Sequence, residues 1–105
     1  TSDSKQNPGY RGVLVTLVAT ALAATPSITP RIEGWDSNTD TWYTVLTAAA
    51  PVTTAAPTTL QLRLHPDTAA GTNVANVNCP RTWRVVVAAG DSDSITYGIG
   101  AEYLP

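Results

Sequence analysis

Apolar and polar residues alternate along several short stretches of the chain, most clearly between Thr59 and His65. Leu60, Leu62 and Leu64 fall on one side of an extended backbone there, and the polar residues between them fall on the other. This period of two predicts a strand with one face in a core and the other in water.

Residues 13–24 (VLVTLVATALAA) are apolar on both faces of an extended chain. They look like the hydrophobic region of a secretory signal, but they are too short to cross a bilayer, which takes about 20 apolar residues. Gly12 before them, Thr25-Pro26 after them and their β-branched content favour a buried strand. Because the chain begins at Thr1 and not at Met, we expect a processed chain or a fragment, from which any signal peptide is already gone.

Two clusters of turn-forming residues predict hairpins. Asp36–Asp40 lies between the aromatic-bearing runs Arg31–Trp35 and Trp42–Leu46. Residues 88–93 lie in the same way between Trp83–Val87 and a last alternating run. Each cluster is expected to join two neighbouring antiparallel strands.

The pattern therefore contains six strands, a weaker seventh and no segment of helical period. It predicts an all-β protein with a single β-sandwich of about six to eight antiparallel strands, of Greek-key or jelly-roll type. We expect this domain to cover residues 12–105. Residues 1–11 are polar, with a turn signal at Asn7-Pro8-Gly9, and we expect an extended N-terminal arm that can reach about 35 Å across a neighbouring subunit.

Composition supports this interpretation and limits the function. The 105 residues include seventeen Thr and fifteen Ala, neither Met nor Phe, and only 13% charged residues, which excludes a helical bundle or coiled coil. A net charge of −2 without a basic run predicts neither a nucleic-acid nor a membrane partner. The single Cys79 excludes an internal disulfide and a cysteine-rich zinc site, and we expect it to be buried as a small apolar residue.

Two acidic clusters invite a calcium interpretation. Asp36, Asn38 and Asp40 have the spacing of the first ligands of an EF-hand loop, but Thr41 and Thr47 stand where that loop needs Gly and a bidentate Glu. We interpret the cluster as a hairpin turn, and residues 91–94 in the same way. No metal or cofactor is expected.

Catalytic chemistry has little support in the pattern. His65 and Asp67 lie close together, but no nucleophile elbow of the form G-x-S-x-G accompanies them. The spacing of Glu33 and Glu102 does not predict a carboxylate pair, and we expect Glu33 to face an Arg on a neighbouring strand. The protein is therefore expected not to be an enzyme.

The three tryptophans leave two interpretations open. An exposed aromatic row would bind sugar rings, whereas Trp is also the main large core residue in a chain that lacks Phe and Met. Trp83 alternates in phase with Val85 and Val87 and is assigned to the core. Trp35 is out of phase with Ile32 and is expected to lie outside.

Three segments together resemble small structural proteins of tailed bacteriophages that infect actinobacteria: PRIEGWDSNTDTWYTVL, LQLRLHP and PRTWRVVVAAGDSDSITYGIGA. The resemblance covers about Val13 to Ala101. His65 stands where an aromatic residue is expected, and Gly98 where Ser is usual. The family supplies no catalytic residues to transfer.

This resemblance implies a virion component, expected as a capsid decoration protein on the outer surface of the head. Its partners would be the major capsid protein and copies of itself, with a trimer as the natural arrangement. The expected partner contacts are Lys5, Tyr10 and Arg11 of the arm, together with Trp35. The alternative is a carbohydrate-binding or host-adhesion module of a phage tail or cell surface.

Overall fold

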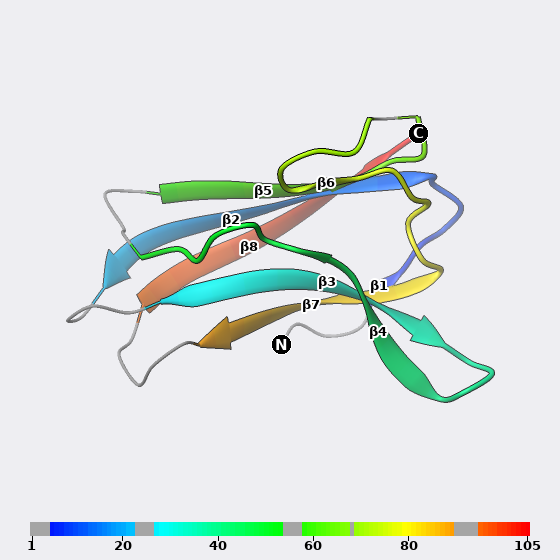
Figure 1. Ribbon diagram of the computed structural model, residues 1–105, viewed down its shortest axis with the longest axis horizontal. Helices are drawn as coiled ribbons and strands as arrows, with labels where there is room; N and C mark the ends of the chain where they lie inside the picture. Colours follow the sequence, from blue (N-terminus) through cyan, green and yellow to red (C-terminus); the bar gives the residue numbers. More distant parts are fainter. Residues whose placement is uncertain (1–4, 23–26, 54–57, 68, 90–94) are drawn as a thin grey trace.

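The computed structural model describes residues 5–22, 27–53, 58–67, 69–89 and 95–105, and these form two four-stranded sheets packed against each other (Figure 1). Sheet A has the strand order β1-β7-β3-β4, and sheet B has the order β6-β5-β2-β8. The strands are β1 (Lys5–Gln6), β2 (Gly12–Leu22), β3 (Ile28–Asp36), β4 (Thr41–Thr47), β5 (Thr58–Leu64), β6 (Val74–Ala75), β7 (Thr82–Ala89) and β8 (Ile95–Leu104).

The all-β class and the two packed sheets are confirmed. The six strands longer than two residues match the six runs that the alternation pattern singled out. Of the two short strands, β1 lies in the segment that was expected to be an arm, and β6 lies between β5 and β7 in the sequence, where no strand was predicted. No helix able to span a membrane occurs in the described ranges.

The first predicted hairpin is confirmed, because β3 and β4 pair directly with Trp35 opposite Trp42. Asp36 begins the turn, and its Oδ1 accepts a hydrogen bond of 2.9 Å from the Asn38 N–H. Asp40 has a φ of 52°, a left-handed conformation that Asp tolerates in turns. The acidic cluster is thus a turn in the structure, as interpreted.

The second predicted hairpin is wrong. β7 lies in sheet A between β1 and β3, whereas β8 pairs with β2 in sheet B, so the chain crosses from one sheet to the other between them. The turn cluster assigned to this hairpin falls mainly on residues 90–94, outside the described residues. Gly and Asp favour any change of chain direction, so they do not distinguish a hairpin from a crossing between sheets.

The core lies between the inner faces of the two sheets. In sheet B, Val13, Val15 and Leu17 of β2 are at most 2% exposed, and alternate residues of β5 pack beside them. In sheet A, Ile32 and Trp83 are fully buried, which confirms the assignment of Trp83 to the core. β2 lies between β5 and β8, and only one of its faces is in the core: Leu14, Thr16 and Val18 on the outer face are half-buried.

Residues 5–11, the described part of the segment assigned to an arm, lie against the domain. Their turn is organised by Asn7, whose Oδ1 accepts hydrogen bonds from the N–H groups of Gly9 (3.1 Å) and Tyr10 (2.8 Å). The Asn7 backbone N–H donates to the Arg81 carbonyl at 2.7 Å, which continues the pairing of β1 with β7. Side-chain and backbone hydrogen bonds therefore attach this segment to sheet A.

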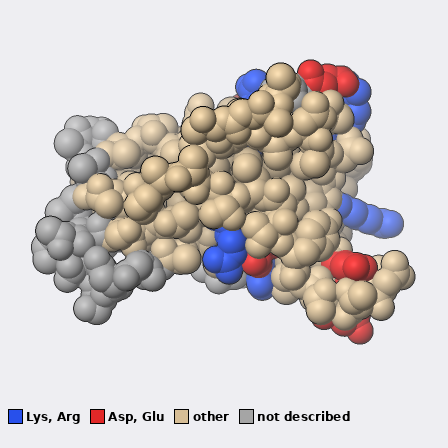
Figure 2. Space-filling view, viewed as in Figure 1, with Lys and Arg blue, Asp and Glu red and all other residues tan. Residues whose placement is uncertain are grey.

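Charged side chains are unevenly distributed over the surface. Figure 2 shows one face of the molecule, on which the charged side chains of the described residues gather toward one end and along one side, while the other described residues on this face are uncharged. This matches a chain with six basic and eight acidic residues and many Thr and Ala.

Candidate functional site

The structure does not bring the four expected contact residues into one site. Trp35 lies on the outer face of sheet A, whereas Lys5, Tyr10 and Arg11 lie along the N-terminal segment. Arg11 forms an ion pair of 2.9 Å with Asp67, and both side chains are more than half exposed, so the pair adds little stability.

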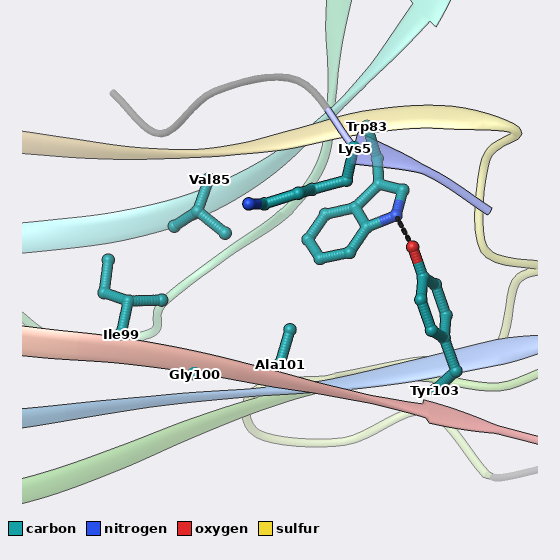
Figure 3. Close-up of a pocket in the computed structure, with 7 residues that line it drawn as sticks. All are labelled: Lys5, Trp83, Val85, Ile99, Gly100, Ala101 and Tyr103. Atoms are coloured by element: carbon teal, nitrogen blue, oxygen red, sulfur yellow. Dashed lines mark hydrogen bonds between the residues drawn. The ribbon is translucent and has the colours of Figure 1, made fainter.

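A cavity of about 330 Å³ lies between the two sheets where β7 and β8 face each other (Figure 3). Trp83 and Val85 of β7 form one wall, and Ile99 and Ala101 of β8 form the other. Lys5 extends its ammonium group along the gap from β1. The lining of this cavity is mainly apolar.

Tyr103 closes one end of this cavity. The Trp83 Nε1–H donates to Tyr103 Oη at 3.2 Å, and the Tyr103 hydroxyl donates to the Gln6 carbonyl at 3.0 Å. Its ring stacks on Tyr10, with centroids 5.2 Å apart and planes 11° from parallel. One tyrosine therefore connects β8, β7 and the N-terminal segment, and Tyr10 serves this contact while remaining 45% exposed.

β8 forms one edge of sheet B. Its register with β2 is regular from Leu104 opposite Gly12 to Tyr97 opposite Ala19. Its other edge has no strand partner in the part of the chain that the structure describes. Tyr97 and Ile99, which alternate onto one face of this strand, are 37% and 38% exposed. The alternation pattern indicated their common face but carried no signal that the strand lies at an edge.

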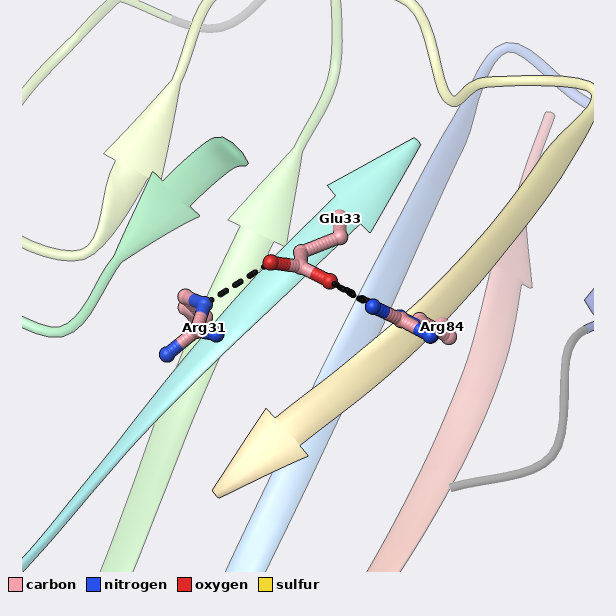
Figure 4. A network of polar contacts seen from close by, with 3 residues as sticks. All are labelled: Arg31, Glu33 and Arg84. Atoms are coloured by element: carbon pink, nitrogen blue, oxygen red, sulfur yellow. Dashed lines mark hydrogen bonds and ion pairs between the residues drawn. The ribbon is translucent and has the colours of Figure 1, made fainter. Parts of the chain in front are cut away.

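A second group of residues lies on the outer face of sheet A (Figure 4). Glu33 is only 7% exposed, and its two carboxylate oxygens accept hydrogen bonds from Arg31 Nε at 2.9 Å and Arg84 Nε at 2.8 Å. Burial alone would raise the pKa of Glu33, but the hydrogen bonds and positive charges of both arginines outweigh it and hold that pKa below its ordinary value. The expectation that Glu33 faces an Arg is confirmed.

The aromatic residues beside this group are partly covered. The Arg84 guanidinium lies 4.1 Å from the centre of the Trp42 ring, and Trp35 and Trp42 are tilted by 59° with centroids 5.2 Å apart. Both rings are half-buried, and with Gln6 and Thr82 they line a shallow hollow of about 380 Å³. Arg84 therefore occupies one face of Trp42 and leaves less aromatic surface for stacking.

The residues considered for catalysis have structural partners. His65 Nδ1 accepts a hydrogen bond from the Asp67 N–H at 3.1 Å, and its Nε2 lies 2.9 Å from the Pro105 carbonyl, to which a proton on Nε2 would donate. The Asp67 carboxylate bonds to Arg11 and not to His65. Among the described residues, no group of three or more His, Cys, Asp or Glu side chains could hold a metal ion.

Cys79 is buried, as expected for a small apolar residue. Burial raises the pKa of its thiol to about 11, so the thiolate is scarce at neutral pH. The thiol lies 3.5 Å from the Pro80 carbonyl.

Comparison with known proteins adds no family assignment. No protein-family model, curated protein or solved structure matches this chain. The surfaces described above are therefore the structural basis for assigning a function.

Proposed function

We propose that this chain is a non-enzymatic structural protein of a virion, namely a decoration protein bound to the outer surface of a tailed-phage head. Its partners there are the major capsid protein and further copies of itself. The observation that carries the proposal is the β8 edge of sheet B, where a long strand with exposed Tyr97 and Ile99 has no partner strand in the described ranges. Such edges recruit other chains through backbone hydrogen bonds.

The low charge of the outer face of sheet B supports the same function. Thr59, Thr16 and Gly100 are uncharged there, and among the described residues of β2, β5 and β8 only Arg63 and Glu102, both opposite Leu14, bring a charge to this face. Close packing against another chain would therefore desolvate few charges. Contacts of modest strength suffice for a protein bound in many copies to a repeating shell. The resemblance of three long segments to phage structural proteins points to such a shell.

The connections between strands support a Greek-key arrangement. The β3–β4 hairpin belongs to sheet A, whereas β2 before it and β5 after it pair with each other in sheet B. A hairpin that crosses over an adjacent strand pair of the opposite sheet is a feature of Greek-key sandwiches.

The proposal is tested on virions of the phage whose genome encodes the chain. Heads and tails are separated, and each fraction is analysed by quantitative mass spectrometry. We expect the polypeptide in the head fraction, at a constant ratio to the major capsid protein. Its absence from virions, or its presence in the tail fraction alone, would contradict a decoration function.

A carbohydrate-binding function is the second candidate, and the hollow beside Trp35 and Trp42 favours it, since aromatic rings beside Gln6 and Thr82 suit a sugar ring. A glycan array probed with the full chain tests it. Binding that is lost in Trp35→Ala but kept in Tyr43→Ala, which alters an exposed aromatic residue of the same hairpin, would support this function. An array without any bound glycan would remove it.

A further inference from the structure

We propose that the β8 edge pairs antiparallel with β8 of a second copy of this chain, about a two-fold axis that passes beside Ile99. The pairing would join the two copies of sheet B into one continuous sheet. It rests on the strand itself and does not depend on a virion function.

The first argument compares β8 with the other edge strands. β1 and β6 are two residues long, which offers little backbone to another chain. β4 is longer, but its register with β3 shifts between Ile32 and Glu33, and such an irregularity makes an edge less suitable for pairing. From Tyr97 to Leu104, β8 pairs regularly with β2 and contains neither Lys, Arg nor Pro. The register shift of this pair lies beyond Tyr97, between Ala19 and Ala21 of β2, and the one charged residue of β8 is Glu102. β8 therefore lacks most of the features with which proteins usually protect an edge.

The second argument is that β8 is complementary to itself. In a two-fold pairing centred on Ile99, Tyr97 of one copy lies opposite Ala101 of the other, so a large side chain meets a small one on the inner face. On the outer face, Glu102 lies opposite the neutral Thr96 and not opposite a second Glu102, so the pairing places no like charges directly across from each other. In this register odd-numbered residues lie opposite odd-numbered residues and even-numbered opposite even-numbered, so the inner face of one copy continues into the inner face of the other. This complementarity selects a second copy as the occupant of the edge.

Cysteine cross-linking tests both the pairing and its register. Opposed residues of antiparallel strands have Cα atoms about 4.5–5.5 Å apart, within the range of a disulfide. In a Cys79→Ala background, we expect Ile99→Cys to form a disulfide-linked dimer under mild oxidation. An equimolar mixture of the Tyr97→Cys and Ala101→Cys chains should give the mixed dimer in preference to either homodimer. Thr59→Cys, an exposed position on β5, is the matched control and should stay unlinked.

Mass measurement gives an independent readout. We expect the unmodified chain to have the mass of two chains in light scattering at high concentration. Ile99→Lys should reduce this to one chain, because an inward-facing charge at an edge opposes pairing. Ile99 is 38% exposed, so the variant should keep its fold, which circular dichroism checks. A monomer at all concentrations, a trimer, or equal cross-linking at position 59 would overturn the proposal.

Discussion

Glu33 of β3 lies directly opposite Arg84 of β7, and the Arg84 Nη2 is 2.8 Å from the Glu33 Oε1. Arg31, on the same face of β3, bonds to the other carboxylate oxygen. The carboxylate is almost fully buried, whereas the arginine side chains remain 31% and 26% exposed. Two cationic partners thus compensate one buried anion, and Arg84 also covers Trp42.

Removal of this carboxylate should destabilise the domain. We expect Glu33→Ala to lower the free energy of unfolding by about 1–3 kcal/mol, because charge-assisted hydrogen bonds are lost while the two arginines can still reach water. Urea unfolding at neutral pH measures the effect. Asp67→Ala is the matched control: it removes the exposed ion pair with Arg11 and should cost less than about 1 kcal/mol. Equal losses in both variants would contradict the importance of the buried group.

The same group should make stability depend on acidity. The pKa of Glu33 is lower in the folded chain than its ordinary value of 4.5, so on acidification the unfolded chain takes up this proton first. Its stabilising contribution is therefore complete above pH 4.5 and is lost as the pH falls through the folded-state pKa. Urea unfolding between pH 7 and pH 2 should show the stability difference between wild type and Glu33→Gln shrinking below pH 4.5. A difference that stays constant over this range would contradict the assignment.

Replacement of glycine by alanine should affect stability differently at Gly12 of β2 and at Gly100 of β8. A Cβ at Gly12 would collide with the Leu64 carbonyl oxygen and the His65 ring, whereas a Cβ at Gly100 would meet open space. We expect Gly12→Ala to cost about 1–3 kcal/mol, as overpacking does, and Gly100→Ala to be neutral or mildly stabilising. Thermal unfolding of both variants gives the comparison. A tolerated Gly12→Ala would show that the backbone of β5 yields at this point.

The hydroxyl of Tyr103 should hold the N-terminal segment in place. Tyr103→Phe keeps the ring stacked on Tyr10 but removes the hydrogen bonds with Trp83 and the Gln6 carbonyl. We expect a loss of about 1–2 kcal/mol and faster amide hydrogen exchange at residues 5–10. Tyr43→Phe, in which the altered side chain is 47% exposed, is the control and should change neither. Unchanged exchange at residues 5–10 in Tyr103→Phe would contradict this role.

The thiol of Cys79 should react slowly with thiol reagents in the folded chain. Burial excludes reagents and raises the pKa of the thiol to about 11, so a disulfide reagent at pH 8 finds little thiolate. We expect slow labelling in native buffer and rapid labelling in concentrated urea, followed by absorbance. Complete labelling of the native chain at the rate seen in urea would show that the thiol is accessible.

The pattern of neighbouring residues was sufficient to predict the long strands and the environments of several side chains. The alternation around Leu60, Leu62 and Leu64 and the apolar run of β2 depend on neighbours in sequence alone, and both strands occur as predicted. The same holds for Trp83 in the core. Alternation also places Arg31 and Glu33 on one face of β3, so the second partner of Glu33 could have been predicted from their spacing of two.

The sequence by itself determined an all-β chain with few charged residues, because side-chain periodicity and β-propensity act over a few residues. Only the tertiary structure decided that β8 pairs with β2 and not with β7, that Arg84 covers Trp42, and that Tyr103 holds the N-terminal segment. Each of these contacts joins residues far apart in the chain. A strand with one apolar face can bury that face beside several different partners, so the choice among them depends on the packing of the whole core and not on the strand alone.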